Sequence, residues 1–559
     1  MPRGSRDILR HPGESRVTRP ALAALAAATL ALPLAGRGAA EDYDLLIRNA
    51  RVVDGTGAPW RRADVAVRGD TIVAVAPHVE GSAPRVVEAG HRVLAPGFID
   101  IHTHAREGIF RSPGAENYVR QGVTTLVEGP DGSSALPLGP FLDELEALGP
   151  GVNFASLVGH GSIRELVLGR ADRAPAAAEL ARMQDLVRQA MREGAFGLST
   201  GLFYVPGSFA RTDEVAALAR VAGELGGIHV SHIRDEAGRV LDSVQETIAI
   251  GEQGRLPTQI THHKMIGRAA WGRSAESLKL VEAARARGVD ATIDQYPYTA
   301  SSTALQAALL PGWALEGGAG SLRGRLADPA DRARILEVVK DKIRNERGGG
   351  DPRNVAIAAC GFDRSLEGQT LASILEGRGL PPTVDNAAVL ALEIVERGGA
   401  SGIFHAISEE DIERILASPY TMVASDGEIP RLGQGAPHPR SYGTFARVLA
   451  VYVRERKLLS LEEAVRKMTS LPAARLGLGD RGLLRPGMKA DLVLFDPDTV
   501  RDRATFEKPH QYAEGVSLVL VNGQVVLDGE RMTGLRPGRV LRGPAFVKRE
   551  GASPATRPD

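Results

Sequence analysis

The chain of 559 residues is poor in cysteine and carries no net charge. Its one cysteine, Cys360, excludes an intrachain disulfide and any cysteine-rich zinc site, so metal ligands must be His, Asp or Glu. Lys plus Arg and Asp plus Glu both number 68, a balance that argues against nucleic acid or an anionic membrane as a main partner. Apolar residues at 43% and charged residues at 24% are typical of a globular protein, here long enough for more than one domain.

The sequence also lacks a good transmembrane run. Five arginines precede an apolar stretch at residues 21–35, which is too short and too rich in alanine to span a bilayer. Gly38, Ala39 and Ala40 then provide small residues suited to cleavage before Glu41. We therefore expect residues 1–40 to be a signal peptide and the mature protein to be periplasmic or secreted; if the segment is not a working signal, the protein is cytoplasmic.

Short strands separated by turns occupy both ends of the chain. Residues 43–95 contain several such runs, with a tight turn at Arg68-Gly69-Asp70. Near the other end, Asn522-Gly523 is a strong hairpin signal between two apolar runs. We predict that residues 41–95 and 480–545 form one small β-sandwich, and that residues 546–559 are a flexible tail.

The middle of the chain, residues 96–479, alternates short apolar runs with amphipathic helices, as parallel α/β barrels do. Eight candidate strands follow in order at residues 97–101, 124–127, 153–158, 195–199, 227–230, 258–261, 290–294 and 421–424. This order predicts a (β/α)8 barrel of the TIM type. The gap of about 125 residues before the last strand is longer than one helix and its loops need, so we predict an inserted subdomain at about 310–385.

Two histidines end the first of these strands. Phe98, Ile99 and Ile101 are typical of a buried strand, and His102 and His104 follow with a spacing of two. Since side chains at i and i+2 of a strand point to one face, both imidazoles can approach one divalent metal ion. An isolated pair of this kind is weak evidence, because core histidines show the same spacing.

Catalytic residues of such barrels lie at the C-terminal ends of the strands. Polar residues with this placement are Asp131 on a glycine-flanked turn, His160, His232 with Arg234, His262 with Lys264, Tyr296 with Tyr298, and Asp426. Each has an ordinary structural explanation when taken alone, such as a core histidine or a helix N-cap. Together, the histidines and the two aspartates provide what a one- or two-metal hydrolytic site requires.

These motifs resemble those of the amidohydrolase superfamily and, more narrowly, of the N-acyl-D-amino-acid deacylases (D-aminoacylases). The likeness covers about residues 43–540 and rests on residues 96–104, 159–161, 197–207, 262–264, 296–298 and 437–445, the last being specific to the deacylase branch. One turn departs from the family pattern: Gly129-Pro130-Asp131-Gly132 stands where the family has Gly-Asn-Cys-Gly with a metal-ligating cysteine. A carboxylate can replace a thiolate as ligand or bridge, but the exchange leaves the number and identity of the metals open.

The resemblance implies a hydrolase that uses one or two zinc ions to cleave the linear amide of N-acyl-D-amino acids. Its ligands would be His102, His104, Asp131, His232 and His262, and Asp426 would carry a proton from the attacking water to the leaving amine. Family position assigns the substrate's α-carboxylate to Lys264 and Arg440, with a hydroxyl from Tyr296 or Tyr298. We expect His160 and Arg234 to orient the ligands from behind, and we assign structural roles to His405 and His438.

Other functions remain open on the same metal site. They are hydrolysis of cyclic amides such as hydantoins and dihydropyrimidines, cleavage of dipeptides with a D-residue, and deamination. A different class is a non-catalytic scaffold that has lost its metal; it predicts missing ligands, and none is missing apart from the cysteine-to-aspartate exchange. The sequence sets neither the side-chain preference of the D-amino acid nor the oligomeric state.

Overall fold

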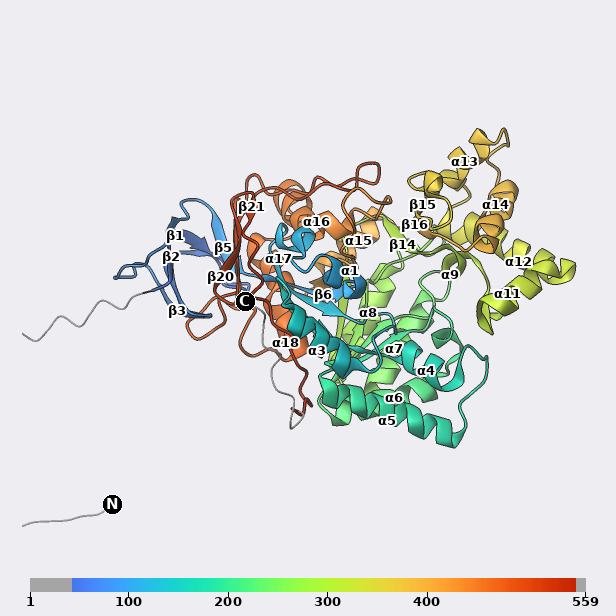
Figure 1. The fold of residues 1–559 in the computed structure, drawn as a ribbon, viewed down its shortest axis with the longest axis horizontal. Helices are drawn as coiled ribbons and strands as arrows, with labels where there is room; N and C mark the ends of the chain where they lie inside the picture. Colours follow the sequence, from blue (N-terminus) through green and yellow to red (C-terminus); the bar gives the residue numbers. More distant parts are fainter. Residues whose placement is uncertain (1–42, 549–559) are drawn as a thin grey trace, which may run out of the picture. The chain divides into compact units, whose positions relative to one another are not determined.

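The computed structural model describes residues 43–548 (Figure 1). The predicted signal peptide and all but the first three residues of the predicted tail therefore lie outside the described residues. Within the described range, no helix combines the length and the apolar composition that a membrane span requires.

Strands from the two ends of the chain join in one sheet of nine strands, ordered β21-β20-β19-β18-β5-β1-β2-β3 with β4 paired to β1. Their bounds are β1 Leu45–Val52, β2 Arg61–Arg68, β3 Thr71–Ala76, β4 Val86–Glu88, β5 Val93–Pro96, β18 Leu492–Phe495, β19 Val516–Val521, β20 Gln524–Asp528 and β21 Arg531–Met532. Ile47 and Val65 share one buried cluster with Leu492 and Leu518, so the sheet folds over itself. The predicted sandwich is thus one continuous, folded sheet.

The segment after β21 leaves this sheet and runs along the barrel. The amide of Leu541 donates to the carbonyl of Phe154 at 2.7 Å, and the amide of Val547 donates to the carbonyl of Arg192 at 3.0 Å. The last part of the range predicted for the sandwich, and the first residues of the predicted tail, therefore pack on the barrel.

Eight parallel strands form the barrel, and each overlaps a predicted strand. They are β6 Phe98–Thr103, β7 Val123–Glu128, β8 Asn153–Ser156 with β9 Val158–Gly159, β10 Gly197–Gly201, β11 Ile228–His232, β12 Thr258–Ile260, β13 Ala291–Gln295 and β17 Thr421–Val423. β8 and β9 form one strand interrupted at Leu157. Between the last and first strands, the amide of Asp426 donates to the carbonyl of His102 at 2.9 Å, and the amide of His104 to that of Gly427 at 2.7 Å.

Apolar side chains from several barrel strands meet in one buried cluster, to which Ala473 and Leu476 also belong. Its members include Ile101 of β6, Val127 of β7, Val230 of β11 and Ala424 after β17. The helices outside the strands are α1 Arg106–Arg111, α2 Glu116–Val119, α3 Leu138–Leu148, α4 His160–Leu168, α5 Ala177–Glu193, α6 Thr212–Glu224, α7 Val240–Gly254, α8 Ser274–Ala286, α15 Glu409–Ala417, α16 Arg440–Arg447, α17 Leu461–Met468 and α18 Ser470–Leu476. This packed cluster supports the residues at the strand ends.

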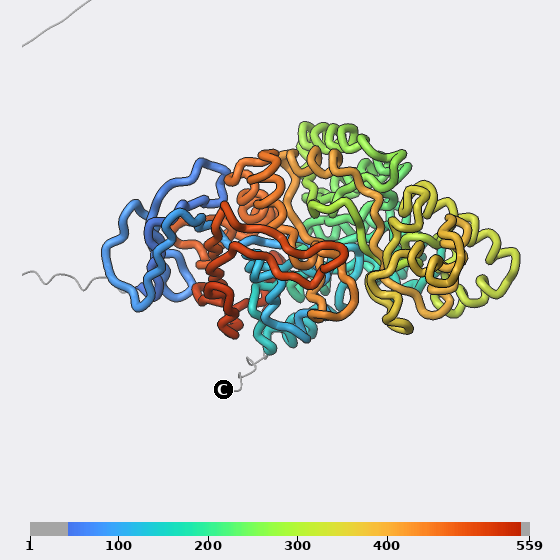
Figure 2. The backbone as a smooth tube through the Cα atoms, turned by 90° about the horizontal axis from the view of Figure 1, so that it is seen from above, coloured from blue at the N-terminus to red at the C-terminus, as the bar shows by residue number. Residues whose placement is uncertain are grey.

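The insertion between β13 and β17 is larger than predicted. It begins with β14 Ala300–Ala304 and ends with β16 Ser401–His405, which pair antiparallel and with β15 Val355–Ala359 form a three-stranded sheet. Its helices are α9 Leu305–Leu309, α10 Gly312–Leu315, α11 Gly318–Ala327, α12 Pro329–Asp341, the π-helical turn η2 Lys342–Arg347, α13 Leu371–Gly377 and α14 Val384–Glu396. It has a buried core of its own that contains Leu371, Leu390 and Phe404. Figures 1 and 2 show it in yellow next to the barrel strands.

Candidate metal centre

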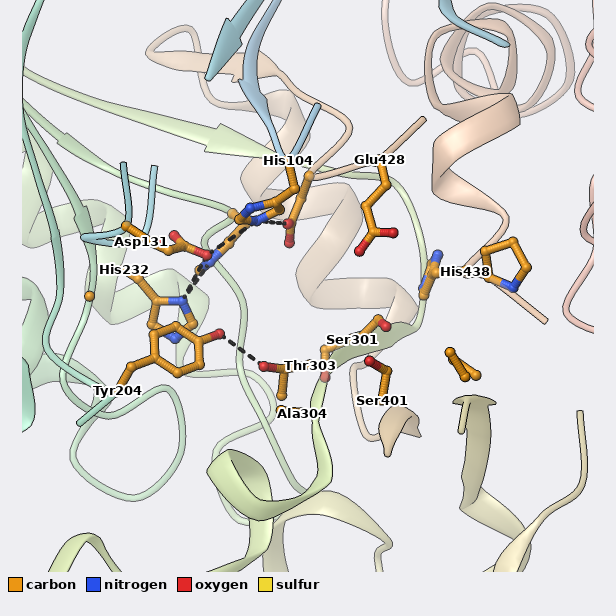
Figure 3. A pocket seen from close by; sticks show the side chains of 18 of the residues that line it. His104, Asp131, Tyr204, His232, Ser301, Thr303, Ala304, Ser401, Glu428 and His438 are labelled. Atoms are coloured by element: carbon orange, nitrogen blue, oxygen red, sulfur yellow. Dashed lines mark hydrogen bonds and ion pairs between the residues drawn. The ribbon is translucent and has the colours of Figure 1, made fainter. Parts of the chain in front are cut away.

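A cavity of about 900 Å³ opens where the barrel strands end (Figure 3). Barrel residues such as His104, Asp131 and His232 form its floor. Residues of the insertion line the same cavity, among them Ser301, Thr303, Arg347 and Ser401. The hydroxyl of Tyr204, which follows β10, lies 3.2 Å from that of Thr303, so one hydrogen bond joins barrel and insertion across the cavity. A volume of this size is that of a small-molecule site.

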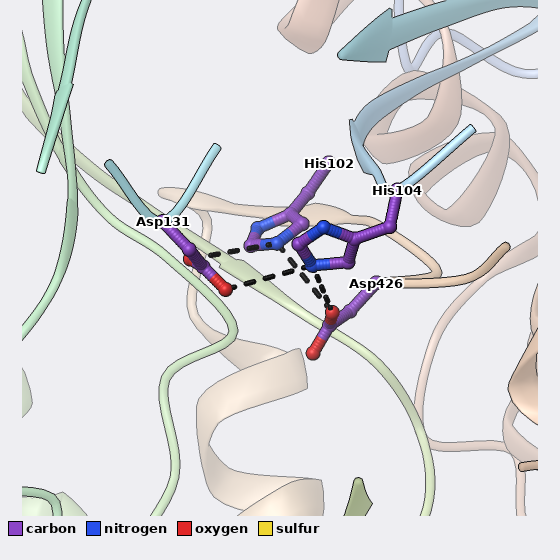
Figure 4. Close-up of side chains that lie close together, drawn as sticks. All are labelled: His102, His104, Asp131 and Asp426. Carbon is purple, nitrogen blue, oxygen red and sulfur yellow. Dashed lines mark ion pairs between the residues drawn. The ribbon is translucent and has the colours of Figure 1, made fainter. Parts of the chain in front are cut away.

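All six residues predicted to bind metal or to move a proton belong to two groups of possible ligands. Figure 4 shows four of them, His102, His104, Asp131 and Asp426. His102, His104, Asp131 and Asp426 form one group of possible ligands, and Asp131, His232 and His262 form a second. Asp131 belongs to both groups. Residues from five strand ends are thereby brought around one carboxylate.

The two oxygens of Asp131 face four imidazoles. Its Oδ1 lies 3.7 Å from Nε2 of His102 and 3.4 Å from Nε2 of His262. Its Oδ2 lies 3.5 Å from Nε2 of His104 and 3.5 Å from Nδ1 of His232. Each oxygen of Asp131 therefore faces one histidine from each group.

The donor set fits a zinc-type ion. Within the described residues, Nε2 of His102 and Oδ1 of Asp131 are buried without a hydrogen-bond partner, and they lie 3.7 Å apart. Buried polar atoms are normally paired, so these two atoms indicate an absent ligand. Imidazole nitrogen and carboxylate oxygen are ordinary zinc ligands, and the second group supplies three, as catalytic zinc sites do.

The backbone at three of these residues is strained. Asp131, His262 and Asp426 have φ values of 55°, 32° and 52°, in a region that residues other than glycine rarely adopt. The turn of Asp131 is enclosed, since a Cβ added at Gly132 would lie 2.6 Å from the amide nitrogen of Gly201. Strain of this kind is typical of functional sites, where the surrounding structure holds a residue in place.

Two buried aspartates behind the histidines were not predicted. Asp294 of β13 accepts a hydrogen bond from the amide of His262 at 2.7 Å, and its Oδ1 lies 3.6 Å from Nδ1 of His102. Asp100 of β6 accepts from the amide of Ser425 at 3.0 Å, and burial raises the pKa of Asp100 to about 7. Both fix the ligands from outside the ring of donors. Each lies inside a strand whose end carries a predicted site residue, and this position is the feature of the sequence that could have identified it.

Asp426 lies against Arg440, the first residue of α16. Their closest atoms, Nη1 of Arg440 and Oδ2 of Asp426, are 2.6 Å apart. Burial opposes ionisation of Asp426, but the charges of Arg440 and His102 and a hydrogen bond from His104 hold the pKa of Asp426 below its usual range. Asp426 is therefore a carboxylate, not an acid, in the resting site.

Glu236 is a further carboxylate that the sequence did not single out. Its Oε1 lies 2.5 Å from Nζ of Lys264 and 3.4 Å from Nδ1 of His262. Burial opposes its ionisation, but the charge of Lys264, with those of the neighbouring imidazoles, lowers the pKa of Glu236 to about 2. Lys264 also lies 2.8 Å from Nδ1 of His262, so the predicted anchor contacts the ligand group directly.

The two predicted tyrosines differ in their access to the cavity. Tyr296 lines it, with Nζ of Lys264 5.5 Å and Cζ of Arg440 4.8 Å from the ring centroid. Tyr298 is buried under Arg447, whose Cζ lies 5.0 Å from its ring centroid, and it is not among the lining residues. Of the two predicted tyrosines, Tyr296 therefore lines the cavity and Tyr298 does not.

His160 and Arg234 do not contact the predicted ligands. Nε2 of His160 lies 3.0 Å from Oε1 of Glu214 on α6. Arg234 binds Glu246 of α7 with Nε at 2.9 Å, away from the histidines. Arg234 lies two residues beyond β11, which ends at His232, so the alternation of strand side chains does not place it on the face of His232. No contact in the described residues supports the predicted role of His160 and Arg234 in orienting the ligands.

The histidines assigned structural roles have such contacts. Nε2 of His438 lies 3.0 Å from the carbonyl of Ala300, and its Nδ1 accepts from the amide of Arg440 at 3.1 Å. His438 thus shapes the start of α16. The ring of His405 packs against the ring of Phe506, with 4.5 Å between the two ring centroids.

Comparison with known proteins agrees with this geometry. The model of the amidohydrolase family matches residues 85–336 and 378–527. A D-aminoacylase of Alcaligenes xylosoxydans xylosoxydans is 37% identical over 90% of this chain and 98% of its own length. An N-acyl-D-glutamate deacylase of the same organism is 38% identical over 91% and 98%.

A solved structure gives the same result. It is the N-acyl-D-glutamate deacylase of Bordetella bronchiseptica complexed with zinc and a phosphonate inhibitor that mimics the tetrahedral intermediate of the reaction. The two share 36% identity and a TM-score of 0.77, and the match covers 90% of this chain and all of the other. The chain therefore belongs to the amidohydrolase family, in the group of the D-aminoacylases.

Proposed function

We propose that this protein is a zinc-dependent hydrolase that converts N-acyl-D-amino acids to a carboxylate and a free D-amino acid. The observation that carries the proposal is the position of Asp131, shared by two groups of possible ligands. The names of the relatives, D-aminoacylase and N-acyl-D-glutamate deacylase, support the substrate class.

Asp131, His232 and His262 would hold the first zinc ion, and His102, His104, Asp131 and Asp426 surround the place of a second. A bound zinc ion supplies Lewis-acid polarisation of the acyl carbonyl and lowers the pKa of water. Asp294 and Asp100 keep the β6 and β12 ends in position around that place.

Asp426 moves the proton. It is ionised in the resting site and so can accept a proton from the attacking water. The leaving amine must receive a proton before it departs. Asp426, once protonated by the water, donates this proton to the amine. Arg440 at 2.6 Å favours the ionised form and so returns Asp426 to its starting state.

The substrate's α-carboxylate binds between Lys264 and Arg440. Both cations flank the ring of Tyr296, whose hydroxyl has no hydrogen-bond partner among the described residues. An arginine can bind a carboxylate with two parallel hydrogen bonds, which fixes its orientation as well as its charge. Fixing this group beside the metal determines which configuration at the α-carbon is accepted.

One experiment tests the proposal. Purified protein is analysed for metal and assayed on matched N-acetyl-D- and N-acetyl-L-amino acids and on hydantoin and dihydropyrimidine. We expect bound zinc and turnover of the D-series alone. Turnover only of the cyclic amides would replace the proposal with a cyclic-amide hydrolase, and a folded protein that binds no metal would support a scaffold.

A matched pair of variants controls for the metal. His262→Ala should lose zinc and activity together, because it removes a ligand nitrogen. His405→Ala should keep both, because its ring packs against Phe506 outside the ligand groups. Equal zinc content in the two variants would contradict the ligand assignment.

We also propose that residues 1–40 direct export. Support comes from the arginines, the apolar run and the small residues before Glu41. N-terminal sequencing of protein recovered from the periplasm of a bacterial host is expected to begin near Glu41. An intact Met1 on cytoplasmic protein would contradict export.

A further inference from the structure

Arg347 is a buried cation in the cavity for which the reaction described above has no use. It ends η2 of the insertion, is 3% exposed, and lines the cavity. A π-helical turn is rare and frequently occurs at functional sites. Its position is fixed, since a Cβ added at Gly267 of the barrel would lie 2.5 Å from the carbonyl oxygen of Asn345 in the same turn.

The guanidinium of Arg347 has few partners. Among the described residues, Nη1 donates to the hydroxyl of Ser301 at 3.4 Å, and Nη2 lies 3.7 Å from Oε2 of Glu236. Its Nε is buried with no hydrogen-bond partner. Five N–H donors with so few acceptors are costly to bury, so an acceptor is expected to complete the set.

The local charge is also unbalanced. Glu236 is shared by Arg347 and Lys264, and Lys264 is closer, at 2.5 Å. One carboxylate between two cations leaves a surplus positive charge on this side of the cavity. The rings of Phe203 and Phe404 lie near the guanidinium, with Cζ 5.1 and 6.0 Å from their centroids, so these neighbours supply no carboxylate to balance its charge.

We propose that Arg347 binds the side-chain carboxylate of the substrate, so that this protein acts on N-acyl derivatives of acidic D-amino acids. The inference rests on the proposed function and names the substrate class within it. Lys264 and Arg440 hold the α-carboxylate beside Tyr296, and Arg347 lies on the other oxygen of the glutamate that Lys264 contacts. A substrate with two carboxylates satisfies both positions.

Overall similarity does not decide which side chain the substrate carries, because relatives of 37% and 38% identity carry the names D-aminoacylase and N-acyl-D-glutamate deacylase. The residues that line the cavity must decide it. An apolar side chain would leave the charge of Arg347 at the cavity wall unbalanced, whereas a carboxylate in the cavity neutralises this charge.

The test compares N-acetyl-D-glutamate with N-acetyl-D-glutamine, which has the same shape and no charge. We expect the wild type to favour the glutamate by at least about tenfold in kcat/KM, the value of one charge-assisted hydrogen-bond pair. Arg347→Met should abolish this preference by raising KM for the glutamate compound, so that the glutamate and glutamine compounds have similar kcat/KM values. N-acetyl-D-aspartate and N-acetyl-D-leucine complete the series and report the length and polarity that the pocket accepts.

Arg364→Met is the matched control. Arg364 is an exposed arginine of the insertion that lines the same cavity and pairs with Glu367 at 3.4 Å, so its removal should not change the ratio. A wild type that prefers the glutamine or leucine compound would overturn the inference. So would an Arg347→Met variant that loses all substrates equally, because a merely structural role of Arg347 would not change the ratio.

Binding separates this inference from the proposed function. If the zinc-loaded protein hydrolyses no N-acyl-D-amino acid, the proposed function fails. Calorimetric titration with N-acetyl-D-glutamate and N-acetyl-D-glutamine then decides on Arg347. Tighter binding of the glutamate by wild type and not by Arg347→Met supports the assignment, and equal binding overturns it.

Discussion

The barrel mouth and the insertion border the same cavity but hold their side chains in different ways. His102, Asp426 and their neighbours extend from paired parallel strands, and backbone hydrogen bonds between the two strand ends fix them further. The insertion has its own core and meets the barrel through side chains such as Thr303. From this difference we infer a division of roles, in which the barrel holds the metal and the α-carboxylate and the insertion contacts the substrate's side chain.

The largest expected effect comes from the barrel side. Asp426→Asn removes proton transfer while keeping the size of the side chain, and we expect kcat to fall about 10³-fold, within the usual range for general acid–base catalysis. Zinc in the second group should be retained, since Asp426 is not a member of it. Steady-state kinetics with metal analysis of the same sample checks both.

Glu428→Gln is the control for that change. Glu428 is an exposed carboxylate that lines the same cavity without belonging to either ligand group. Its removal should leave kcat nearly unchanged. Comparable losses in the two variants would show that the cavity's overall charge matters rather than a proton carried by Asp426.

On the insertion side, we expect Leu390→Ala to lower the free energy of unfolding more than it lowers kcat. Leu390 of α14 is 1% exposed within the insertion core, and such a truncation costs about 3 kcal/mol. We expect an earlier unfolding transition and a raised KM, with zinc content unchanged. Leu380→Ala, at an exposed site of the same subdomain, is the control and should have little effect.

Loss of zinc in the Leu390→Ala variant would contradict the separate roles of barrel and insertion. It would mean that the insertion helps to hold the ligands as well as the substrate. Calorimetric unfolding with and without a chelator distinguishes the two cases, since the metal stabilises only the part that binds it.

A buried histidine in the barrel wall makes the stability of the protein depend on pH. His229 of β11 lies between Thr200 and Thr258, with its ring nitrogens 3.1 and 2.9 Å from their hydroxyls. Burial, with the nearby His160, lowers the pKa of His229 to about 3. The unfolded chain therefore takes up this proton first, so the stability is complete above pH 6.5 and is lost as the pH falls toward 3.

His229→Gln should remove this acid dependence. Wild type is expected to lose about 2 kcal/mol more than the variant between pH 6.5 and 5, at 1.36 kcal/mol per pH unit. Ser231→Ala, which deletes a hydrogen bond to Thr200 without a titrating group, should shift stability equally at both pH values. Urea unfolding at the two pH values measures the difference; parallel curves for wild type and His229→Gln would refute the assignment.

The same division explains what the sequence could predict. Apolar runs such as Phe98–Thr103 and Val123–Glu128 are strong strand signals, and strand ends of a parallel barrel share one edge. That rule was enough to bring six distant residues to one place. It depends on regular structure, and it fails for Arg234, which lies beyond the end of β11.

The insertion offers no such rule. Its first strand, Ala300–Ala304, consists of small and hydroxyl-bearing residues without an apolar run, so its start was placed about ten residues too late. Glu236 and Arg347 were missed because each lies among other charged residues, and only the folded chain determines which of them is buried. Long-range packing, not local pattern, selects them.

Asp131 gives the most specific test of the strand-end site, because the resemblance found in the sequence places it where the family has a metal-ligating cysteine. Asp131→Cys should keep a zinc site but change its selectivity, since thiolate is the softer ligand. We expect the preference for zinc over manganese to rise by about tenfold, or about 1.4 kcal/mol, in a competition measured by metal analysis. Asp131→Asn keeps the size, loses the charge, and should weaken both metals together. If Asp131→Cys leaves the preference unchanged, the carboxylate that faces four imidazoles is not a ligand. The two groups of possible ligands would then share no residue, and the side chains at the strand ends would not be enough to explain a two-metal hydrolase.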